Sequence, residues 1–506
     1  MPRFIKTDKE YQRLMLTVDL NKQIIPGSFE DTISKVIDLV DTSDFEDKIK
    51  NDLTGRPAYN PKLLLKIVLY SYSIGIFYSR KISKLCMDNV IMMALSENTT
   101  PDFTLIADFI SSNEKEIIIL FQKVLLICEE NKLLGHTTFA LDGCKLPSNA
   151  SKEWSGTFFQ LSKKSEKLKN KLKMIIDMNK SEDFNPTKDE IKKYKKTTDK
   201  LNRSISKINH FLNTEQKKIS KRGHENKSNI TDNESAKIQT GHGVIQGYNG
   251  QAFVDDKHQV ILGAEVFGTG PDNDLLEPMI ETTEINMTSI GKSDDYFEGK
   301  TIAADTGYFS EANLKAAYYK KIDAYIPDQQ FRKRDIRFKD KDKHNPKKKD
   351  KFIKEDFKFD SEKDCFICKN NRVLKKEGKV CKIKNNYYQK YIAWQIDCGC
   401  CKLRNKCLRN DKTRRRTLMF HIKKIDCWTD RYFTKKMIAK IDSPEGRKKY
   451  SLRMGIVEPV FANIRIHKRL DRFTLRGKSK VNSQWLLFCL VHNIGKIMKY
   501  GKLQAN

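Results

Sequence analysis

The stretch GHGVIQGYNGQAFVDDKHQVILGAEVFG, residues 241–268, decides the fold of this chain. Its two runs of β-favouring residues flank Asp255 and Asp256, a pattern that predicts a β-hairpin. A helix-forming stretch, NDLLEPMIETTEIN, separates the hairpin from KTIAADTGYFS at residues 300–310, an apolar strand that ends in Asp305. A further helix and the strand IDAYIP follow. Hairpin, helix, strand, helix and strand in this order predict an α/β core.

One more strand of the core is expected upstream, in TTFALDGCKLPSNA at residues 137–150. Thr137 to Leu141 favours a strand, and the pair Asp142-Gly143 after it is typical of a turn. The chain before this strand has mostly helical periodicity. A helical domain is therefore expected to precede the core.

The segments around the core differ from it in composition. Asn60-Pro61 is a helix-start signal in the N-terminal part. A Lys-rich stretch with apolar residues at heptad spacing predicts an inserted antiparallel pair of coiled helices. The charged run at 329–352 predicts a mobile loop. We expect a helical DNA-binding or dimerisation domain at 1–133, the core at 134–152, 223–330 and 415–506, the helical hairpin at 153–222, and the basic loop with a Cys-rich insert at 331–414.

The chain is strongly basic, with 96 Lys and Arg against 65 Asp and Glu in 506 residues and a formal net charge of +31. This charge favours a polyanionic partner, because each phosphate that a cation neutralises releases condensed counterions. A Lys-rich proteome bias is the alternative. The N-terminus has no apolar core of a secretory signal, and no stretch is long enough to span a membrane. We expect a soluble, cytoplasmic protein without a membrane partner, whose cysteines lie in a reducing compartment.

Three acids are the candidate catalytic residues. Asp142 and Asp305 each end a predicted strand close to a glycine, which places carboxylates at the rim of a sheet. Glu458 is an acid within a segment rich in Arg and Lys. Converging carboxylates need a cation, and hard oxygen ligands suit Mg²⁺ or Mn²⁺. Two such ions would assist an in-line phosphoryl displacement. For each aspartate alone, an ordinary turn residue is the alternative.

These stretches, in this order along nearly the whole chain, resemble the DDE transposases of bacterial insertion sequences. GRPAYNPKLLLKIVLYSYSIGIFYSRKISKLCMDNV is similar to the helical N-terminal domain of the family, FALDGCKLPSNASK to its first-aspartate motif and GYNGQAFVD to its second strand block. IAADTGYFSEANL resembles the second-aspartate motif, and RMGIVEPVFANIR with RFTLRGKSKVNSQWLLFCLVHNI resembles the glutamate region. The branch it resembles is the insertion-sequence family numbered eleven-eighty-two, which is related to the groups numbered four and five.

The resemblance implies a ribonuclease-H-like mixed sheet core in which Asp142, Asp305 and Glu458 are the catalytic carboxylates of a two-metal Mg²⁺ or Mn²⁺ site. It also implies a transposase that binds the terminal inverted repeats of its element, cleaves a DNA strand and transfers it to target DNA. The partner is then double-stranded DNA, and a homodimer is expected in the synaptic complex because two ends must be joined. A non-catalytic or domesticated DNA-binding protein with the same fold is the alternative, and a plain nuclease is a third hypothesis.

The related groups carry a Tyr, Arg, Glu, Lys pattern around the glutamate. Tyr450 and Arg453 match its first two places, and Arg465 stands where the Lys would be. Arg453 lies five residues before Glu458, and five residues turn a helix by about 140°, so the two are not expected on one face. Pro459 predicts a start or a kink of the helix at this point. Further phosphate-binding candidates, with structural salt bridges as the alternative for each, are Arg476 and Lys478.

Seven of the twelve cysteines fall within residues 365–407. Five of these seven form two Cys-x2-Cys pairs and one further Cys, a spacing typical of a zinc ribbon, while an iron–sulfur cluster and free thiols are the alternatives. The pattern of the resembled family retains four of them, which makes a structural zinc site the preferred interpretation, with Cys365 as an alternate ligand. The four expected zinc ligands are Cys368, Cys398, Cys401 and Cys407.

Overall fold

The structure is a computed structural model that describes residues 19–49, 57–179, 187–220, 223–241, 243–335, 351–360, 362–383, 386–408, 410, 412–422 and 432–502. The chain divides into two compact units, residues 1–326 with 444–506 and residues 327–443. Most of the expected loop at 329–352 lies outside the described residues, as does Cys427. No helix in the described ranges is both long and apolar enough to cross a membrane.

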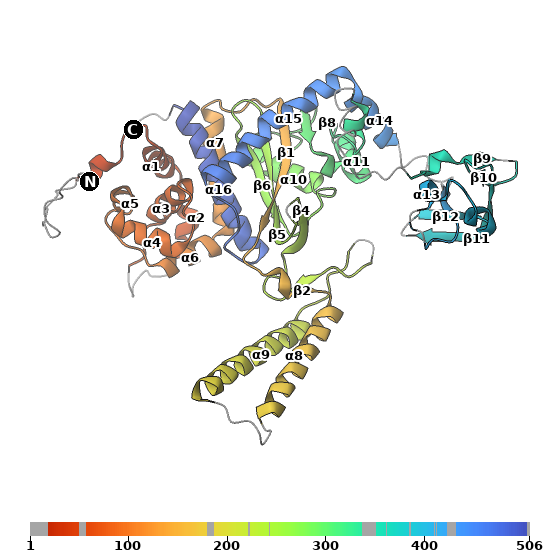
Figure 1. Ribbon diagram of the computed structural model, residues 1–506. Helices are drawn as coiled ribbons and strands as arrows, with labels where there is room; N and C mark the ends of the chain where they lie inside the picture. The colour runs from red at the N-terminus through yellow and green to blue at the C-terminus, as the bar shows by residue number, and fades with distance from the viewer. Residues whose placement is uncertain are drawn as a thin grey trace, which may run out of the picture. The chain divides into compact units, whose positions relative to one another are not determined.

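The N-terminal part of the first unit is helical, as predicted. Asn60 caps the helix that Pro61 begins, because its side chain accepts a hydrogen bond from the backbone N–H of Lys62. Figure 1 shows the first six of these helices on one side of the long helix α16 (Lys478–Tyr500), which packs against the third and the seventh. The helices are α1 (Phe29–Leu39), α2 (Ser43–Glu46), α3 (Pro61–Ser73), α4 (Ser79–Asp88), α5 (Val90–Leu95), α6 (Phe103–Ser112) and α7 (Glu114–Glu130).

A mixed sheet forms the core of the first unit, and this part of the predicted α/β fold is confirmed. Its strand order is β4-β5-β1-β7-β8, and β6 also pairs with β5. β5 and β6 form the predicted antiparallel hairpin, whereas β1, β7 and β8 run parallel. The strands are β1 (Thr138–Pro147), β4 (Ala236–Thr240), β5 (Gly243–Asp255), β6 (Ile261–Phe267), β7 (Thr301–Ala304) and β8 (Asp323–Tyr325).

Helices cover both faces of this sheet. On one face, α10 (Leu276–Ser289) packs so closely on β6 that a Cβ at Gly263 would collide with the side chain of Thr283. On the other face, α16 packs on β6, and a Cβ at Gly250 of β5 would meet the ring of Trp485 at 3.2 Å. The helices α11 (Glu311–Tyr319) and α15 (Pro444–Ala462) complete the layers.

The helix α15 continues through Pro459, so the helix start expected at this point is wrong. Proline lacks the N–H that would bond to the carbonyl four residues earlier, which is that of Gly455. The side chain of Gln259, in the turn between β5 and β6, donates to this Gly455 carbonyl at 2.9 Å instead. After Ala462 the chain widens into a π-helical turn, Asn463–His467. The carbonyl that has no partner within the helix because of Pro459 therefore accepts a hydrogen bond that joins α15 to the β5–β6 turn.

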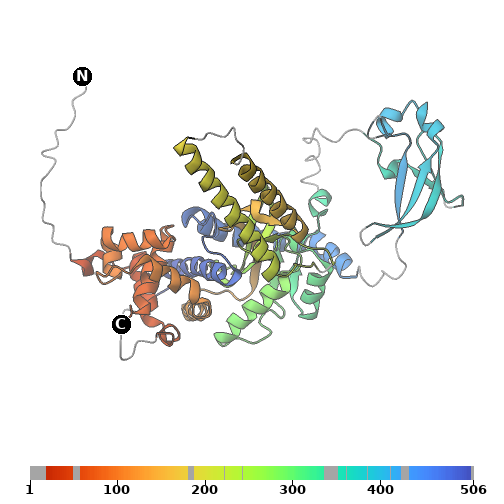
Figure 2. The ribbon, with the colours of Figure 1, turned by 90° about the horizontal axis from the view of Figure 1, so that it is seen from below.

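The Lys-rich stretch forms two antiparallel helices, α8 (Phe158–Asn179) and α9 (Lys188–Thr214), which Figure 2 shows side by side. Thr187 and Glu190 form a capping box at the start of α9. Leu161, Ile208 and Phe211 are the buried core at the root of this hairpin. Short strands β2 (Ser155–Gly156) and β3 (Ser228–Asn229) pair beside it.

The second unit contains a five-stranded sheet with the order β13-β12-β11-β10-β9. The strand β13 pairs with β12, so the expected return to the core at residue 415 is wrong. The core resumes with α15, because α14 (Tyr432–Asp442) also belongs to the second unit. The other elements are β9 (Lys358–Asp360), β10 (Cys365–Ile367), β11 (Val373–Ile383), β12 (Asn386–Ala393), β13 (Thr417–Ile422), α12 (Gln395–Gly399) and α13 (Arg404–Cys407).

Candidate functional site

Two of the predicted catalytic acids directly follow the paired segments of two neighbouring parallel strands. Leu141 of β1 pairs with Ala304 of β7, so the next residues along the two strands, Asp142 and Asp305, lie side by side. The N–H of Gly143 donates to Asp142 Oδ1 at 2.8 Å. Asp305 caps a short 3₁₀ turn and accepts from the N–H of Thr306 at 2.6 Å. Strand pairing thus brings together two carboxylates that lie far apart in the sequence.

The sequence prediction of a turn at Asp142-Gly143 is wrong, because β1 runs through both residues without a break. A Cβ at Gly143 would collide with the side-chain amide of Gln251 and lie 2.6 Å from Asn249 Oδ1. The glycine is therefore required by close packing rather than by a turn. Asp142 points to the opposite face of the sheet, where α15 lies.

Arg453 of α15 forms an ion pair with the first of these acids. Its Nη1 donates to Asp142 Oδ2 at 2.7 Å, and its side chain is only 10% exposed. Burial raises the pKa of Asp142, Arg453 opposes this rise, and the charge of Asp305 adds to it. The guanidinium of Arg453 therefore neutralises part of the charge that the two half-buried carboxylates would otherwise hold against each other.

Glu458, the third predicted acid, does not join the pair. It is exposed on α15, whereas Arg453 and Val457 on the same helix are buried. In the described ranges, no group of three or more His, Cys, Asp or Glu side chains is arranged to hold a metal ion. Asp142 and Asp305 fit a divalent cation as two oxygen ligands on one side. The carboxylate of Glu458 would have to turn toward these two aspartates to become a third ligand of the same cation.

The other predicted members of the glutamate region lie around the same helix. Tyr450 is next to Arg453, whose guanidinium carbon is 6.0 Å from the Tyr450 ring centre. Burial raises the pKa of Cys144 to about 11, and the charge of Arg465 opposes this rise. Cys144 is two residues beyond Asp142 on the same face of β1, so the charge of Arg465 acts on the face of the strand that carries Asp142.

The last two predicted phosphate contacts, Lys478 and Arg476, have other partners than the two acids. The ammonium of Lys478 forms a salt bridge with Glu265 at 2.7 Å, the structural alternative for this residue. Arg476 Nε donates to the carbonyl of Asn149 at 2.7 Å, two residues beyond the end of β1. Arg476 therefore sits beyond the end of β1 rather than next to the acids.

A polar network behind β1 had no signal in the sequence. Asn249 and Gln251 are fully buried on β5, and both donate to Asp272 Oδ1, at 2.6 and 3.1 Å. Lys145 of β1 approaches the other oxygen of Asp272 at 3.3 Å. The hydroxyl of Tyr308, just after Asp305, donates to the side chain of Gln251. This network lies on the face of the sheet opposite to Arg453 and connects β1 to the turn that follows Asp305. It therefore holds in place the backbone that carries both acids.

The second unit brings four cysteines around one small cavity of about 30 Å³. Backbone N–H groups point at two of these sulfurs, from Arg372 to Cys368 at 3.3 Å and from Arg416 to Cys398 at 3.4 Å. Burial raises the pKa of Cys407, the charge of Arg416 opposes the rise, and the other three thiols add to it. The donor set and the N–H groups suit a soft metal ion, although the sulfurs do not form a closed coordination shell. The four cysteines are the predicted Cys368, Cys398, Cys401 and Cys407, and Cys365 does not line the cavity.

Two family models match the chain. Residues 18–112 match the model described as Transposase domain (DUF772), and residues 367–498 match the model described as Transposase DDE domain. The second match includes Glu458 and ends within α16, but it does not include Asp142 or Asp305. Neither match identifies the branch numbered eleven-eighty-two, which stays a prediction. No curated protein matches the chain, and no solved structure does.

Proposed function

With transposase domains matched at both ends of the chain, this protein belongs to the DDE transposases of insertion-sequence type, and we propose that it binds the terminal inverted repeats of its element, cleaves one DNA strand there and transfers the new end to target DNA. The observation that carries the proposal is that Asp142 and Asp305 directly follow Leu141 and Ala304, which pair on the parallel strands β1 and β7, and that Arg453 forms an ion pair with Asp142. Paired carboxylates beside a cation are what a metal-assisted phosphoryl transfer requires.

The proposed core is ribonuclease-H-like. This is supported by a sheet in which β6, β5 and β1 are antiparallel neighbours and β1, β7 and β8 are parallel neighbours. The first acid lies on the central strand β1, and the second follows β7. A helix that carries the third acid, α15, packs on β1, β7 and β8.

In this proposal Asp142, Asp305 and Glu458 would hold two divalent ions, Mg²⁺ or Mn²⁺, and the exposed carboxylate of Glu458 would have to turn toward the aspartates. A bound ion of this kind supplies a Lewis acid that lowers the pKa of an attacking hydroxyl and stabilises the leaving oxygen. The chain itself supplies the positioning. The amide network around Asp272 fixes β1 from behind, and Arg453 and Arg465 are cations within reach of a phosphate held at the acids.

The experiment is strand cleavage on a duplex that carries an end of the element, with Mg²⁺ or Mn²⁺ present. Asp142→Asn, Asp305→Asn and Glu458→Gln are each expected to abolish cleavage while binding to the duplex survives. Glu445→Gln, an exposed acid near the start of the same helix, is the matched control and should cleave normally. Full cleavage by all three site variants would refute the assignment. An intact protein that binds ends without ever cleaving them would favour the non-catalytic alternative, and cleavage without strand transfer would favour a plain nuclease.

The partners follow from the same proposal. Element ends and target are double-stranded DNA, and a homodimer holds two ends together in the cytoplasm. The N-terminal helices are proposed to bind DNA or to dimerise, and the four cysteines of the second unit to hold a structural zinc ion. The small cavity shared by those sulfurs supports the zinc proposal.

A further inference from the structure

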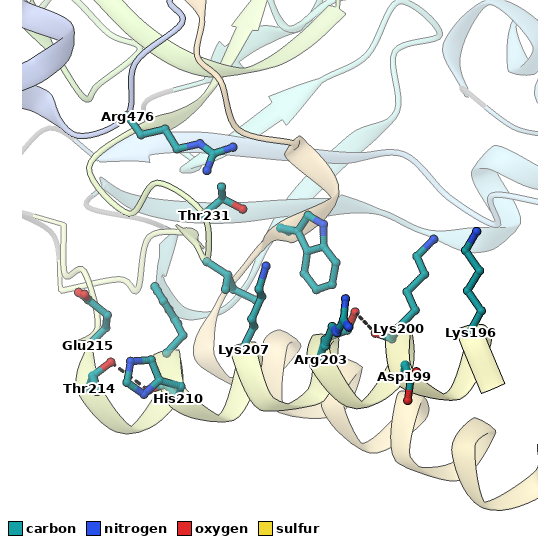
Figure 3. A pocket seen from close by; sticks show the side chains of 14 residues that line it. Lys196, Asp199, Lys200, Arg203, Lys207, His210, Thr214, Glu215, Thr231 and Arg476 are labelled. Atoms are coloured by element: carbon teal, nitrogen blue, oxygen red, sulfur yellow. Dashed lines mark hydrogen bonds between the residues drawn. The ribbon is translucent and has the colours of Figure 1, made fainter. Parts of the chain in front are cut away.

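A groove at the root of the helical hairpin has five Lys and Arg residues among its fourteen lining residues and is separate from the acid pair. We call it the α9 groove. It has a volume of about 790 Å³, and one of its walls is the exposed face of α9 (Figure 3). Trp154, Ile230 and Thr231 lie opposite, together with Arg476. Two acids, Asp199 and Glu215, are among the lining residues, and the cations are Lys196, Lys200, Arg203, Lys207 and Arg476, with His210 beside them.

The four cations of α9 form one stripe. They follow each other at intervals of four, three and four residues, the spacing that keeps side chains on one face of a helix, and all four are exposed. Within the part of the chain that the structure describes, no salt bridge uses any of them. Four unneutralised cations on one face repel each other, so an anionic partner would stabilise this arrangement.

The length of the stripe suits a DNA backbone. From Lys196 to Lys207 the helix rises about 16 Å at 1.5 Å per residue. One strand of B-DNA presents a phosphate every 3.4 Å of its axis, so the stripe spans about five phosphates. An acidic protein surface is the alternative partner, but it would not present charge at such regular spacing. The groove also offers apolar surface, because Trp154, Phe211 and Ile230 line it between the charges.

The groove also leads toward the acid pair. Arg476 lines it and bonds to Asn149 just beyond β1, the strand that carries Asp142. The backbone N–H of Phe473 bonds to the carbonyl of Pro147, the last residue of β1, at 2.8 Å. From Asp142 to Pro147 a strand extends about 17 Å. A DNA segment of moderate length could therefore occupy the groove and reach the acids together.

We propose that the α9 groove binds the phosphodiester backbone of element DNA and leads it to Asp142 and Asp305. This inference rests on the proposed function, because it assumes that the acids act on DNA. It assigns a role to the inserted hairpin, whose Lys-rich composition alone does not separate a DNA contact from a solvated surface.

The test compares two triple variants with equal loss of charge. Lys200→Gln, Arg203→Gln and Lys207→Gln together remove cations of the groove. Lys169→Gln, Lys171→Gln and Lys173→Gln together remove exposed cations of the neighbouring helix α8 that do not line it. Binding of a generic duplex and of its single strand is measured over a salt series, and circular dichroism confirms that both variants fold.

The groove variant should bind about 10- to 100-fold more weakly, and its plot of log K against log salt should become shallower by about 0.9 for each phosphate that the protein no longer neutralises. The α8 variant should keep the wild-type slope. Equal slopes for the two variants would overturn the proposal, as would displacement of the duplex by polyglutamate at matched charge. Weaker binding confined to the duplex, or to the single strand, supports the groove and identifies which DNA form it holds.

The failure of the proposed function gives a different result. Asp142→Asn should keep the wild-type salt slope, because the acid pair is separate from the groove. If the wild-type protein never cleaves DNA but the groove variant still shows a shallower salt dependence, the proposed catalysis fails and the groove stands. If the wild-type protein cleaves DNA and the groove variant binds and cleaves equally well, the groove fails and the catalysis stands.

Discussion

The guanidinium of Arg453 on α15 donates to the carboxylate of Asp142 on β1 at 2.7 Å, across a sequence separation of 311 residues. This contact joins the helix that carries Glu458 to the central strand of the sheet. It also places a fixed cation against the two aspartates. Arg453 and Asp142 therefore link the stability of the core to the charge of the candidate site.

The first prediction concerns this ion pair. Arg453→Gln should lower the free energy of unfolding by about 2 kcal/mol at neutral pH, because the mostly buried Asp142 loses its partner while Asp305 stays beside it. Urea unfolding measures the change. Lys449→Gln on the same helix removes a more exposed salt bridge with Asp323 and should cost less than about 1 kcal/mol. Equal losses for the two variants would contradict a special role for Arg453.

The sequence could predict those parts of the fold that depend on local pattern. The hairpin around Asp255-Asp256 and the helix start at Asn60-Pro61 are both present. Each is decided by a few neighbouring residues, so short-range preferences suffice. The strands of the mixed sheet and the helices of the N-terminal region could be predicted for the same reason, and the structure confirms both.

The remaining features depend on contacts between distant segments. Asp142 meets Asp305 only because β1 and β7 pair in one register, which neither strand encodes alone. The turn expected at Asp142-Gly143 failed because Gln251 and Asn249, on a distant strand, require the glycine. The strand β13 pairs with β12 in the second unit, a pairing that depends on a partner strand and not on the sequence of β13 alone. The network of Asp272 was missed because buried amides on a strand have no motif.

A second prediction tests the close packing behind Asp142. Gly143→Ala should destabilise the fold by about 2 kcal/mol or more, because its Cβ would push against the buried amides of Asn249 and Gln251. Gly455→Ala is the control, since a Cβ there meets nothing within 4 Å on α15. It should stabilise the protein by about 0.5–1 kcal/mol through helix propensity. Thermal unfolding of both variants measures these changes. A Gly143→Ala variant as stable as the wild-type protein would show that the amides of Asn249 and Gln251 can move away at little cost.

A third prediction concerns the cysteines of the second unit. The purified protein should contain about one zinc ion per chain, because four thiolates and nearby N–H donors surround one cavity. Cys401→Ser should lose most of this zinc, measured by elemental analysis, and should become sensitive to proteolysis in the second unit. Cys400→Ser is the matched control, because Cys400 is exposed and does not line the cavity. Iron instead of zinc in the purified protein would indicate an iron–sulfur cluster. Protein without metal would show that the four cysteines are free thiols.

The last prediction concerns the pH dependence of stability and rests on His492 of α16. Burial lowers the pKa of His492 to about 3, and its Nε2 donates to the carbonyl of Gln259 at 2.8 Å. In the unfolded chain the imidazole has a pKa near 6.5. As the pH falls from about 7 toward 3, the unfolded chain therefore binds a proton at His492, whereas the folded protein does not. From this residue alone, the free energy of unfolding should therefore fall by about 2 kcal/mol between pH 8 and pH 5.

Urea unfolding at the two pH values, compared between the wild-type protein and His492→Gln, isolates this term because every other titrating group is shared. The variant should lose about 2 kcal/mol less than the wild-type protein between pH 8 and pH 5. If His492→Gln shows the full wild-type loss, the buried imidazole accepts a proton in the folded state. The Gln259 turn between the sheet, α15 and α16 would then have to rearrange to admit the charge.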